Sequence, residues 1–214
     1  MNIAIIGTGN VGNALGKSLT RGGHSVVFYG RDNTKAEQVA AAHSATASAD
    51  LGDTVRGADV VILAVPYSSV DAVGREIAPL VAGKIVIDAT NPLKPDMSGL
   101  ATTGTSAAEE LAALVPGADV VKGFNTLFAS VQGEPSTSSQ RVDALFATDS
   151  PAARETFAKL ADSAGFRPVY VGPLAAAREL ESLALLNIRL QVLTGGAWNT
   201  TLKLVDAPEK ALAA

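Results

Sequence analysis

The sequence predicts an α/β protein with a doubly wound, mostly parallel sheet and a small C-terminal extension that ends in a long apolar helix. Short apolar segments alternate with segments of helical periodicity along most of the 214 residues, an order typical of a parallel sheet with helices on both faces. The segment 60–65 is apolar at every position, as the central strand of such a sheet is. A glycine-rich turn after the first strand completes the evidence for this fold class.

Strands and helices are expected to alternate from the N-terminus onwards. The first five expected strands cover residues 3–6, 25–29, 47–49, 60–65 and 85–87. Helices are expected after the glycine turn, near 34–42 and over the stretch that contains Val70, Val73, Ile77 and Leu80. Gly22 and Gly23 end the first helix, because glycine readily adopts the backbone conformation found just past a helix. Pro66 ends the fourth strand.

The second half continues this order with clearer boundary signals. Ser106 and Glu109 have capping-box spacing and open a helix that ends at Pro116, while Ser150 followed by Pro151 opens the next helix. Strands are expected at 119–122, 142–148 and 167–171, and loops rich in Gly, Ser, Thr and Pro at 93–105 and 132–140. The last helix, about 175–193, is apolar over most of its surface and is expected to be covered by a second subunit.

Composition and charge exclude several classes of function. The net charge is −4 and Lys and Arg are not clustered, so no nucleic-acid partner is expected. The absence of cysteine excludes disulfides, thiolate catalysis and Cys-ligated metal sites, and no metal site is predicted. The chain opens directly on an apolar strand, and its longest later apolar stretch, 183–193, is shorter than the roughly 20 residues of a membrane helix. We therefore expect a cytoplasmic protein with no membrane partner.

A dinucleotide-binding motif follows the first strand. It matches the pattern G-x-G-x-x-G and consists of Gly7, Thr8, Gly9, Asn10, Val11 and Gly12. In this pattern the first glycine permits a tight turn, the second lets a pyrophosphate approach the backbone, and the third lets helix and strand pack closely. The N-terminus of the following helix favours an anion. The alternative is a plain structural turn, but the strand before it and the amphipathic helix after it favour a Rossmann domain.

The residues after the second strand favour NADP(H) over NAD(H). NAD-binding Rossmann domains carry an acidic residue at this strand end, where it binds the ribose 2′-hydroxyl. Here that position is Gly30 or, at the latest, Arg31, whose forked guanidinium suits a 2′-phosphate. Lys35 follows one helical turn later. NAD remains open if the strand ends one residue later, at Asp32, and both cations could simply be solvated.

We expect residues 1–140 to form the NADP-binding Rossmann domain. Residues 141–214 are expected to form a substrate-binding and dimerisation extension packed on it. The chain lacks a Tyr-x-x-x-Lys pair, a His-Glu-x-x-His motif and a G-x-S-x-G motif. His24 and His43 are interpreted as surface residues, and Asp88 as a structural hydrogen-bonding residue. Because no acid–base pair is evident, a redox ring that accepts hydride itself is favoured over a simple ketone as the acceptor.

The sequence resembles the NADPH:coenzyme F420 oxidoreductase family over nearly its whole length. The similar segments are 5–12, 29–31, 64–66, 88–93, 121–126 and 172–174, followed by Arg178, 181–183 and Asn187. The glycine turn is generic among dinucleotide-binding proteins, whereas the C-terminal segment is more particular to this family.

The resemblance implies hydride exchange between NADP(H) and the deazaflavin coenzyme F420, in a homodimer joined through the C-terminal helices. By position, it implies that Ala64, Val65, Pro66, Thr90 and Asn91 line the cofactor site. It also implies that the segment from Asn125 and Thr126 to Ala129 flanks the nicotinamide and the deazaflavin, with Asn125 and Thr126 positioning the reactants. Archaeal members carry a serine and a histidine where this chain has Gly30 and Asn125. This difference implies fewer contacts to the 2′-phosphate and a different acceptor pocket.

Other functions remain open from the sequence. One is an NADPH-dependent reductase of a flavin, a quinone or a small imine, since the cytosolic domain of membrane metalloreductases is also similar. Another is a non-catalytic NADPH-binding sensor. A distant similarity to β-hydroxyacid dehydrogenases places Arg178 where those enzymes use a helix lysine, but arginine holds its proton too tightly for that acid–base role.

Overall fold

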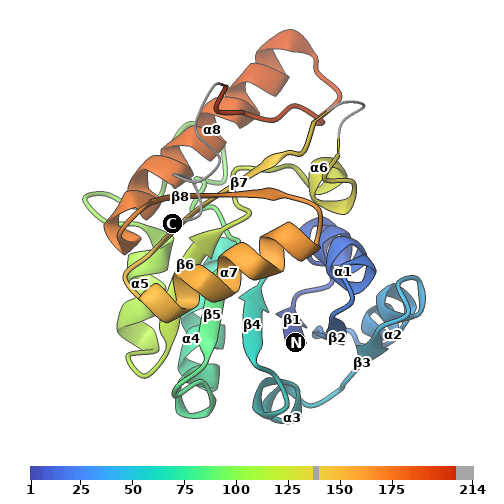
Figure 1. The fold of residues 1–214 in the computed structure, drawn as a ribbon. Coiled ribbons are helices and arrows are strands. Elements are labelled where there is room, and N and C mark those ends of the chain that lie inside the picture. The colour runs from blue at the N-terminus through green and yellow to red at the C-terminus, as the bar shows by residue number, and fades with distance from the viewer. Residues whose placement is uncertain (137–139, 206–214) are drawn as a thin grey trace.

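The computed structural model describes residues 1–136 and 140–205, whose strands form one eight-stranded sheet in the order β3-β2-β1-β4-β5-β6-β7-β8 (Figure 1). Neighbouring strands are parallel except for the antiparallel pair β6–β7. This confirms the predicted doubly wound, mostly parallel sheet. The strands are β1 Asn2–Ile6, β2 Ser25–Tyr29, β3 Thr46–Ala47, β4 Val60–Leu63, β5 Ile85–Asp88, β6 Asp119–Gly123, β7 Asp143–Thr148 and β8 Arg167–Gly172.

The helices follow the predicted order with two additions. The α-helices are α1 Asn10–Arg21, α2 Asn33–Ala41, α3 Leu51–Arg56, α4 Val70–Ile77, α5 Ala107–Leu114, α6 Ala129–Gly133, α7 Pro151–Ser163 and α8 Ala177–Thr194. The short 3₁₀ helices of the described residues are η1 Tyr67–Ser69, η2 Ala78–Leu80 and η3 Leu174–Ala176. Both predicted caps are confirmed, because the side chains of Ser106 and Ser150 accept hydrogen bonds from backbone N–H groups three residues later.

Helices α3 and α6 were not expected. Helix α3 is too short for a periodic pattern, and it begins where the carboxylate of Asp50 accepts a hydrogen bond of 2.7 Å from the backbone of Asp53. Helix α6 extends into the expected loop 132–140, so that prediction is wrong at its start. The buried amide of Gln132 donates to the carbonyls of Phe124 and Leu127 and thereby stabilises the turn. Residues 137–139 of that loop lie outside the described residues.

The sheet has an apolar core on each face. Side chains of β1 alternate between the two cores, with Ile3 and Ile5 in one and Ala4 and Ile6 in the other. Helices α1, α2 and α7 contribute to the first core, and α3, α4 and α5 to the second. Among the described residues, no helix is long and apolar enough to cross a membrane.

The C-terminal part extends the same sheet. β7 pairs with β6, and β8 adds the outermost strand. Helix α8 follows, and the chain reverses after it at Gly195, which has a φ of +61° that favours glycine. The segment after this reversal returns to the sheet, where the backbone N–H of Leu204 donates to Asp143 at 2.8 Å. Figure 1 shows α6 and α8 at the same end of the molecule.

Candidate functional site

The glycine turn is shaped by close contacts between β1, α1 and β4. A Cβ atom on Gly7 would lie 2.2 Å from the carbonyl oxygen of Ala64, and one on Gly12 would lie 2.0 Å from the carbonyl oxygen of Gly7. By contrast, a Cβ on Gly9 would meet no atom within 4 Å. Gly7 and Gly12 are therefore required by packing, whereas Gly9 leaves open space in front of the turn.

Open space at Gly9 faces the N-terminus of α1. Gly9 is the N-cap of this helix and offers no side-chain hydrogen bond to it, and no acidic residue occupies the first turn. The first backbone N–H groups of a helix have no partner within the helix, so this end carries a partial positive charge. Such a helix end is an anion-binding site when a glycine-rich turn lets the anion approach.

A first cavity, here called the cationic cavity, lies beside this turn at the carboxyl ends of β1, β2 and β4. Its volume is about 440 Å³. The chain runs from β1 through β2 to β3 on one side of the sheet and then crosses to β4 on the other side of β1. The cavity therefore lies where the strand order reverses, which is the usual ligand site of this architecture. Its lining residues are Ile6, Gly7, Thr8, Gly9, Tyr29, Gly30, Arg31, Asp32, Lys35, Ala64, Val65, Pro66, Ser69 and Val73.

The cationic cavity takes its charge from Arg31 and Lys35, which are both exposed at the start of α2. Within residues 1–136 and 140–205, no ion pair joins either cation to a carboxylate. Asp32 instead caps α2, since its carboxylate accepts from the backbone N–H of Lys35 at 3.1 Å. Strand β2 ends at Tyr29, so the position directly after it is Gly30.

Gly30 leaves room for a neighbouring side chain. A Cβ at this position would lie 2.9 Å from the methyl group of Thr8 and 3.0 Å from its hydroxyl oxygen. Thr8 therefore fills the space that a larger residue after β2 would occupy. Thr8 and Arg31 both line the cationic cavity.

A second cavity, here called the amide cavity, lies on the other side of the glycine turn and has a volume of about 620 Å³. Asn10 and Val11 of the turn line it, so the two cavities share the N-terminus of α1. Its other walls come from the ends of β5 and β6, from α6 and from α8. The lining residues are Asn10, Val11, Asn13, Ala14, Asn91, Asn125, Thr126, Leu127, Phe128, Ala129, Ser130, Ala184, Ile188, Ala197 and Trp198.

Two asparagines hold each other in this cavity. The side-chain amide of Asn91 donates to the backbone carbonyl of Asn125 at 2.9 Å, and the amide of Asn125 donates back to Oδ1 of Asn91 at 3.0 Å. Asn125 also donates to the carbonyl of Leu180 in α8 at 3.2 Å. Its own Oδ1 is buried and has no hydrogen-bond partner among the residues that the structure describes. This acceptor is available to a ligand that carries an N–H group.

The backbone before Asn125 is strained. Phe124 has a φ of +63°, a left-handed conformation that is costly for a residue with a side chain. Its fully buried ring packs against Phe157 and Phe166 at centroid distances of 4.9 and 5.4 Å, which holds it in place. The chain leaves β6 through this residue, and Asn125 and Thr126 then face the amide cavity.

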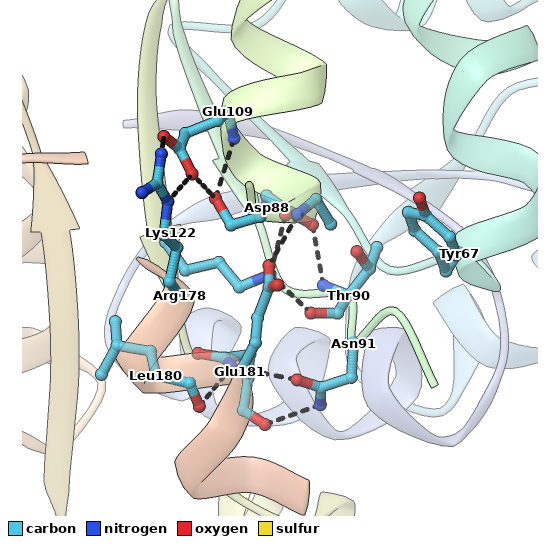
Figure 2. A network of polar contacts seen from close by, with 12 residues as sticks. Tyr67, Asp88, Thr90, Asn91, Glu109, Lys122, Arg178, Leu180 and Glu181 are labelled. Atoms are coloured by element: carbon cyan, nitrogen blue, oxygen red, sulfur yellow. Dashed lines mark hydrogen bonds and ion pairs between the residues drawn. The ribbon is translucent and has the colours of Figure 1, made fainter. Parts of the chain in front are cut away.

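A buried ion cluster lies next to Asn91 (Figure 2). Lys122 of β6 donates to Asp88 at 2.9 Å, to Glu181 at 2.7 Å and to the carbonyl of Thr90 at 2.8 Å. The side chains of Lys122, Asp88 and Glu181 are fully buried. Asp88 and Lys122 are register partners on neighbouring strands, whereas Glu181 arrives from α8. Burial raises the pKa of Glu181, although Lys122 acts in the opposite direction.

This cluster fixes α8 against the sheet. Thr90 directly precedes Asn91 in the chain, and Glu181 directly follows Leu180, whose carbonyl accepts from Asn125. The same oxygen of Glu181 also accepts from the backbone N–H of Ala107 at 2.9 Å, which ties in α5. The amide cavity therefore depends on charged groups that do not line it.

Arg178 lies outside the amide cavity. Its guanidinium binds both carboxylate oxygens of Glu109 at 2.6 and 2.8 Å, as Figure 2 shows. The Arg178 guanidinium holds the pKa of Glu109 below its usual range. Arg178 therefore joins α8 to α5 and lines neither the cationic cavity nor the amide cavity.

The structure brings most of the sequence-predicted residues to the two cavities. Gly12 and Thr90 line neither of them. Gly12 permits the turn to pack, and Thr90 offers its carbonyl to Lys122. Asp88 has the structural hydrogen-bonding role expected for it, since it accepts from the backbone of Thr90 at 2.9 Å and from Lys122.

Sequence reasoning missed Lys122 and Glu181 as supports of the site, and Trp198 as part of its wall, whereas Phe128 lies within the expected segment from Asn125 to Ala129. A usable signal existed for Lys122, because a lysine within the apolar strand 120–123 requires a buried carboxylate partner. No comparable signal marks Glu181 or Trp198, since their positions depend on how α8 and the chain after it dock.

The chemistry available in the amide cavity is hydrogen bonding without proton transfer. In the described part of the chain, its lining consists of amides, hydroxyls and apolar groups and includes no ionisable side chain. Tyr67 lies near the ion cluster but donates to Glu110 at 2.6 Å, and burial, with Glu110, raises its pKa to about 12. His43 contacts Asn13 at 2.5 Å from outside the cavity, and burial lowers its pKa.

Three comparisons with known proteins indicate the same family. The family described as "NADP oxidoreductase coenzyme F420-dependent" matches residues 2–92. An F420-dependent NADP reductase from Methanothermobacter thermautotrophicus is 31% identical over 227 aligned residues, covering 98% of this chain and 97% of that protein. A crystal structure of a protein from Arthrobacter sp. FB24, assigned as an F420-dependent NADP reductase, superimposes with a TM-score of 0.84 at 29% identity, covering 94% of this chain and 99% of that one.

The chain is also similar to part of a longer protein. Metalloreductase STEAP3 from Rattus norvegicus is 30% identical over 187 residues, which cover 86% of this chain. The chain spans only 36% of the length of that metalloreductase. The similarity therefore concerns one region of a larger molecule.

Proposed function

This chain belongs to the F420-dependent NADP reductases, a family of oxidoreductases, and on that basis we propose that it transfers a hydride between NADP(H) and a deazaflavin acceptor of the coenzyme F420 type. The observation that carries this proposal is the pair of cavities that both lie at the N-terminus of α1. One is cationic, and the other is lined by amides and aromatic rings without an ionisable group among the described residues.

The cationic cavity suits the phosphorylated adenosine end of NADP(H). The N-terminus of α1 would bind the diphosphate beside Gly9, where nothing obstructs its approach. Arg31 and Lys35 would bind the 2′-phosphate, with a hydroxyl contributed by Thr8. Asp32 is engaged as the cap of α2, which supports NADP over NAD.

The amide cavity suits the nicotinamide end and the acceptor. The buried, unpartnered Oδ1 of Asn125 would accept from the nicotinamide carboxamide, and Asn91 holds Asn125 in the required orientation. When bound, NADPH supplies the hydride. Asn125, Thr126 and Ala129 would position the two rings and exclude water from between them.

The lack of an ionisable group in the amide cavity favours a ring acceptor. Reduction of a ketone usually needs a proton donor beside the hydride. A deazaflavin delocalises the added electrons over its own ring system and can exchange its proton with solvent. The protein therefore needs only to align two flat rings.

The test is the absorbance of oxidised coenzyme F420 after mixing with the protein and NADPH. We expect the absorbance to bleach at a rate proportional to protein concentration, and no bleaching above the protein-free control would refute the proposal. Parallel reactions with a flavin, a quinone and a cyclic imine follow NADPH consumption and identify a different acceptor. Tight NADPH binding without turnover of any acceptor would indicate a sensor instead.

We further propose that the working unit is a homodimer joined through α8. The outward face of this helix exposes four apolar side chains, Leu186, Leu190, Val192 and Leu193, and the last of these is 81% exposed. A contiguous exposed apolar surface is a typical protein interface. Sedimentation should give a dimer for the wild type and a monomer for the Leu186→Glu, Leu193→Glu double variant. The control Val205→Glu changes an exposed apolar residue outside α8 and should remain dimeric.

A further inference from the structure

Two aromatic rings from distant parts of the chain form one wall of the amide cavity. Phe128 precedes α6, and Trp198 follows α8. Their rings meet edge to face, with centroids 5.3 Å apart and planes at 80°. Trp198 is the only tryptophan of the chain, and 43% of it remains exposed. Ala184 and Ile188 of α8 continue the wall.

The backbone of Trp198 is held in a costly conformation. Its φ is +55°, in the left-handed region that residues with side chains rarely adopt. Its N–H donates to the side-chain oxygen of Gln191 at 3.0 Å, and its carbonyl accepts from the hydroxyl of Ser130 at 2.5 Å. Strain of this kind persists only where the surroundings fix it, and it concentrates at functional sites.

A line of polar side chains connects this segment to the loop after β6. Gln191 donates to Thr200 at 2.7 Å, Thr200 donates to Asn187 at 2.8 Å, and Asn187 donates to the carbonyl of Thr126 at 3.5 Å. Asn187 and Gln191 are buried on the inner face of α8, a place where apolar residues are usual. Their hydrogen bonds fix the position of Trp198 relative to Thr126.

Core packing does not explain why Trp198 is held in a strained conformation while its side chain stays partly exposed. An exposed indole fixed at a cavity mouth loses the apolar burial that it would gain in a core. It gains that burial when a flat, apolar ring lies against it, because aromatic faces stack on one another. Every flat heteroaromatic ring offers such a face, whereas a saturated or branched acceptor does not.

We propose that Trp198, seated against Phe128, selects planar aromatic hydride acceptors by stacking against the acceptor ring. This inference rests on the proposed function, because it assigns the acceptor side of the same site. It makes Trp198 a specificity-determining residue and leaves NADP(H) binding to the glycine turn and the cationic cavity.

The first experiment uses the emission of the single tryptophan. Oxidised coenzyme F420 or flavin mononucleotide is titrated into the wild type with saturating NADP⁺, and equilibrium dialysis measures binding independently. We expect the emission of Trp198 to be quenched in step with binding. Unchanged emission while dialysis reports a bound ring would overturn the inference, and so would a failure of every planar ring to bind.

The second experiment compares variants in turnover. Trp198→Leu should raise the KM of the planar acceptor about tenfold, with the KM of NADPH within about twofold of the wild type, since one ring–aromatic stack has a worth of this order. Trp198→Phe should retain most of the acceptor affinity. The control Leu204→Ala changes an exposed apolar residue of the same C-terminal segment that lines neither cavity, and should leave both KM values unchanged.

The outcomes separate this inference from the proposed function. Normal reduction of F420 by Trp198→Leu with an unchanged acceptor KM would overturn the role of Trp198 and leave the function intact. Equal rises in both KM values would also overturn it, because they would indicate a general disturbance of the site. Absence of F420 reduction by the wild type, with quenching of Trp198 by another planar ring, would overturn the F420 assignment and support the inference.

Discussion

The cationic and amide cavities flank one glycine turn but are built in different ways. The cationic cavity is formed by three segments within residues 6–73, each following the end of a parallel strand. The amide cavity gathers residues from position 10 to position 198. The first cavity therefore follows from the order of strands in the sheet, whereas the second exists only after α8 and the chain beyond it have docked.

The two cavities also differ in where their charges lie. The cations of the first are exposed side chains without ion-pair partners in the described chain, so they are free to bind a ligand at little cost to folding. The charges of the second are fully buried behind its lining and bind each other. Substitutions should consequently affect ligand affinity in the first region and folding in the second.

The largest effect is expected from Lys122→Met, which leaves the carboxylates of Asp88 and Glu181 buried without their cation. Breaking a buried ion pair from one side costs about 3–5 kcal/mol. The free energy of unfolding, measured by urea denaturation, should fall by this order. Lys159→Met, which removes an exposed lysine paired with Glu155, should have no measurable effect. A Lys122→Met protein as stable as the wild type would show that the amide cavity does not depend on the ion cluster.

An intermediate effect, on affinity alone, is expected from Arg31→Ala. Loss of a charge-assisted contact to the 2′-phosphate should raise the Kd of NADPH about 10- to 100-fold. The Kd of NADH should stay within about twofold and the thermal midpoint should not change, because Arg31 is exposed. Arg56→Ala removes the same charge from α3, away from both cavities, and serves as the control. An equal loss of affinity for both dinucleotides would contradict the assignment of Arg31.

The smallest effect is expected in the pH dependence of the free energy of unfolding, compared between the wild type and Glu181→Gln. Burial raises the pKa of Glu181 above its ordinary value of 4.5, so the folded state binds this proton more tightly than the unfolded state does. The wild type therefore loses stability from this group as pH rises from below 4.5 through the folded-state pKa. The variant lacks this titration, so the stability of the wild type relative to the variant should decrease over that window.

Urea denaturation at a series of pH values measures this difference. Glu179→Gln, on the exposed side of the same helix, should show no such trend. A wild-type advantage over Glu181→Gln that grows with rising pH would mean that pairing with Lys122 outweighs burial.

The same contrast explains what could be predicted from the sequence. The glycine turn, the strand order around it and the cations after β2 depend on neighbours in the chain, so their local pattern is sufficient. Asn91 and Asn125 were expected only through family resemblance, because nothing local indicates that the two asparagines meet.

The remaining features require tertiary placement. The pairing of Lys122 with Asp88 depends on the register between β5 and β6, and the arrival of Glu181 depends on the docking of α8. The position of Trp198 depends on the chain reversal at Gly195. Helix α3 was missed for a different reason, since six residues are too few to reveal a helical period.

Direct transfer of hydrogen from NADPH to the acceptor is the central claim, and isotopic labelling tests it most directly. NADPH deuterated at C4 on one face or on the other is mixed with the protein and oxidised coenzyme F420, and the reduced product is analysed by mass spectrometry. We predict that one of the two labelled forms transfers its deuterium to the deazaflavin. A product without deuterium from either form would contradict direct hydride transfer between two rings held in the amide cavity.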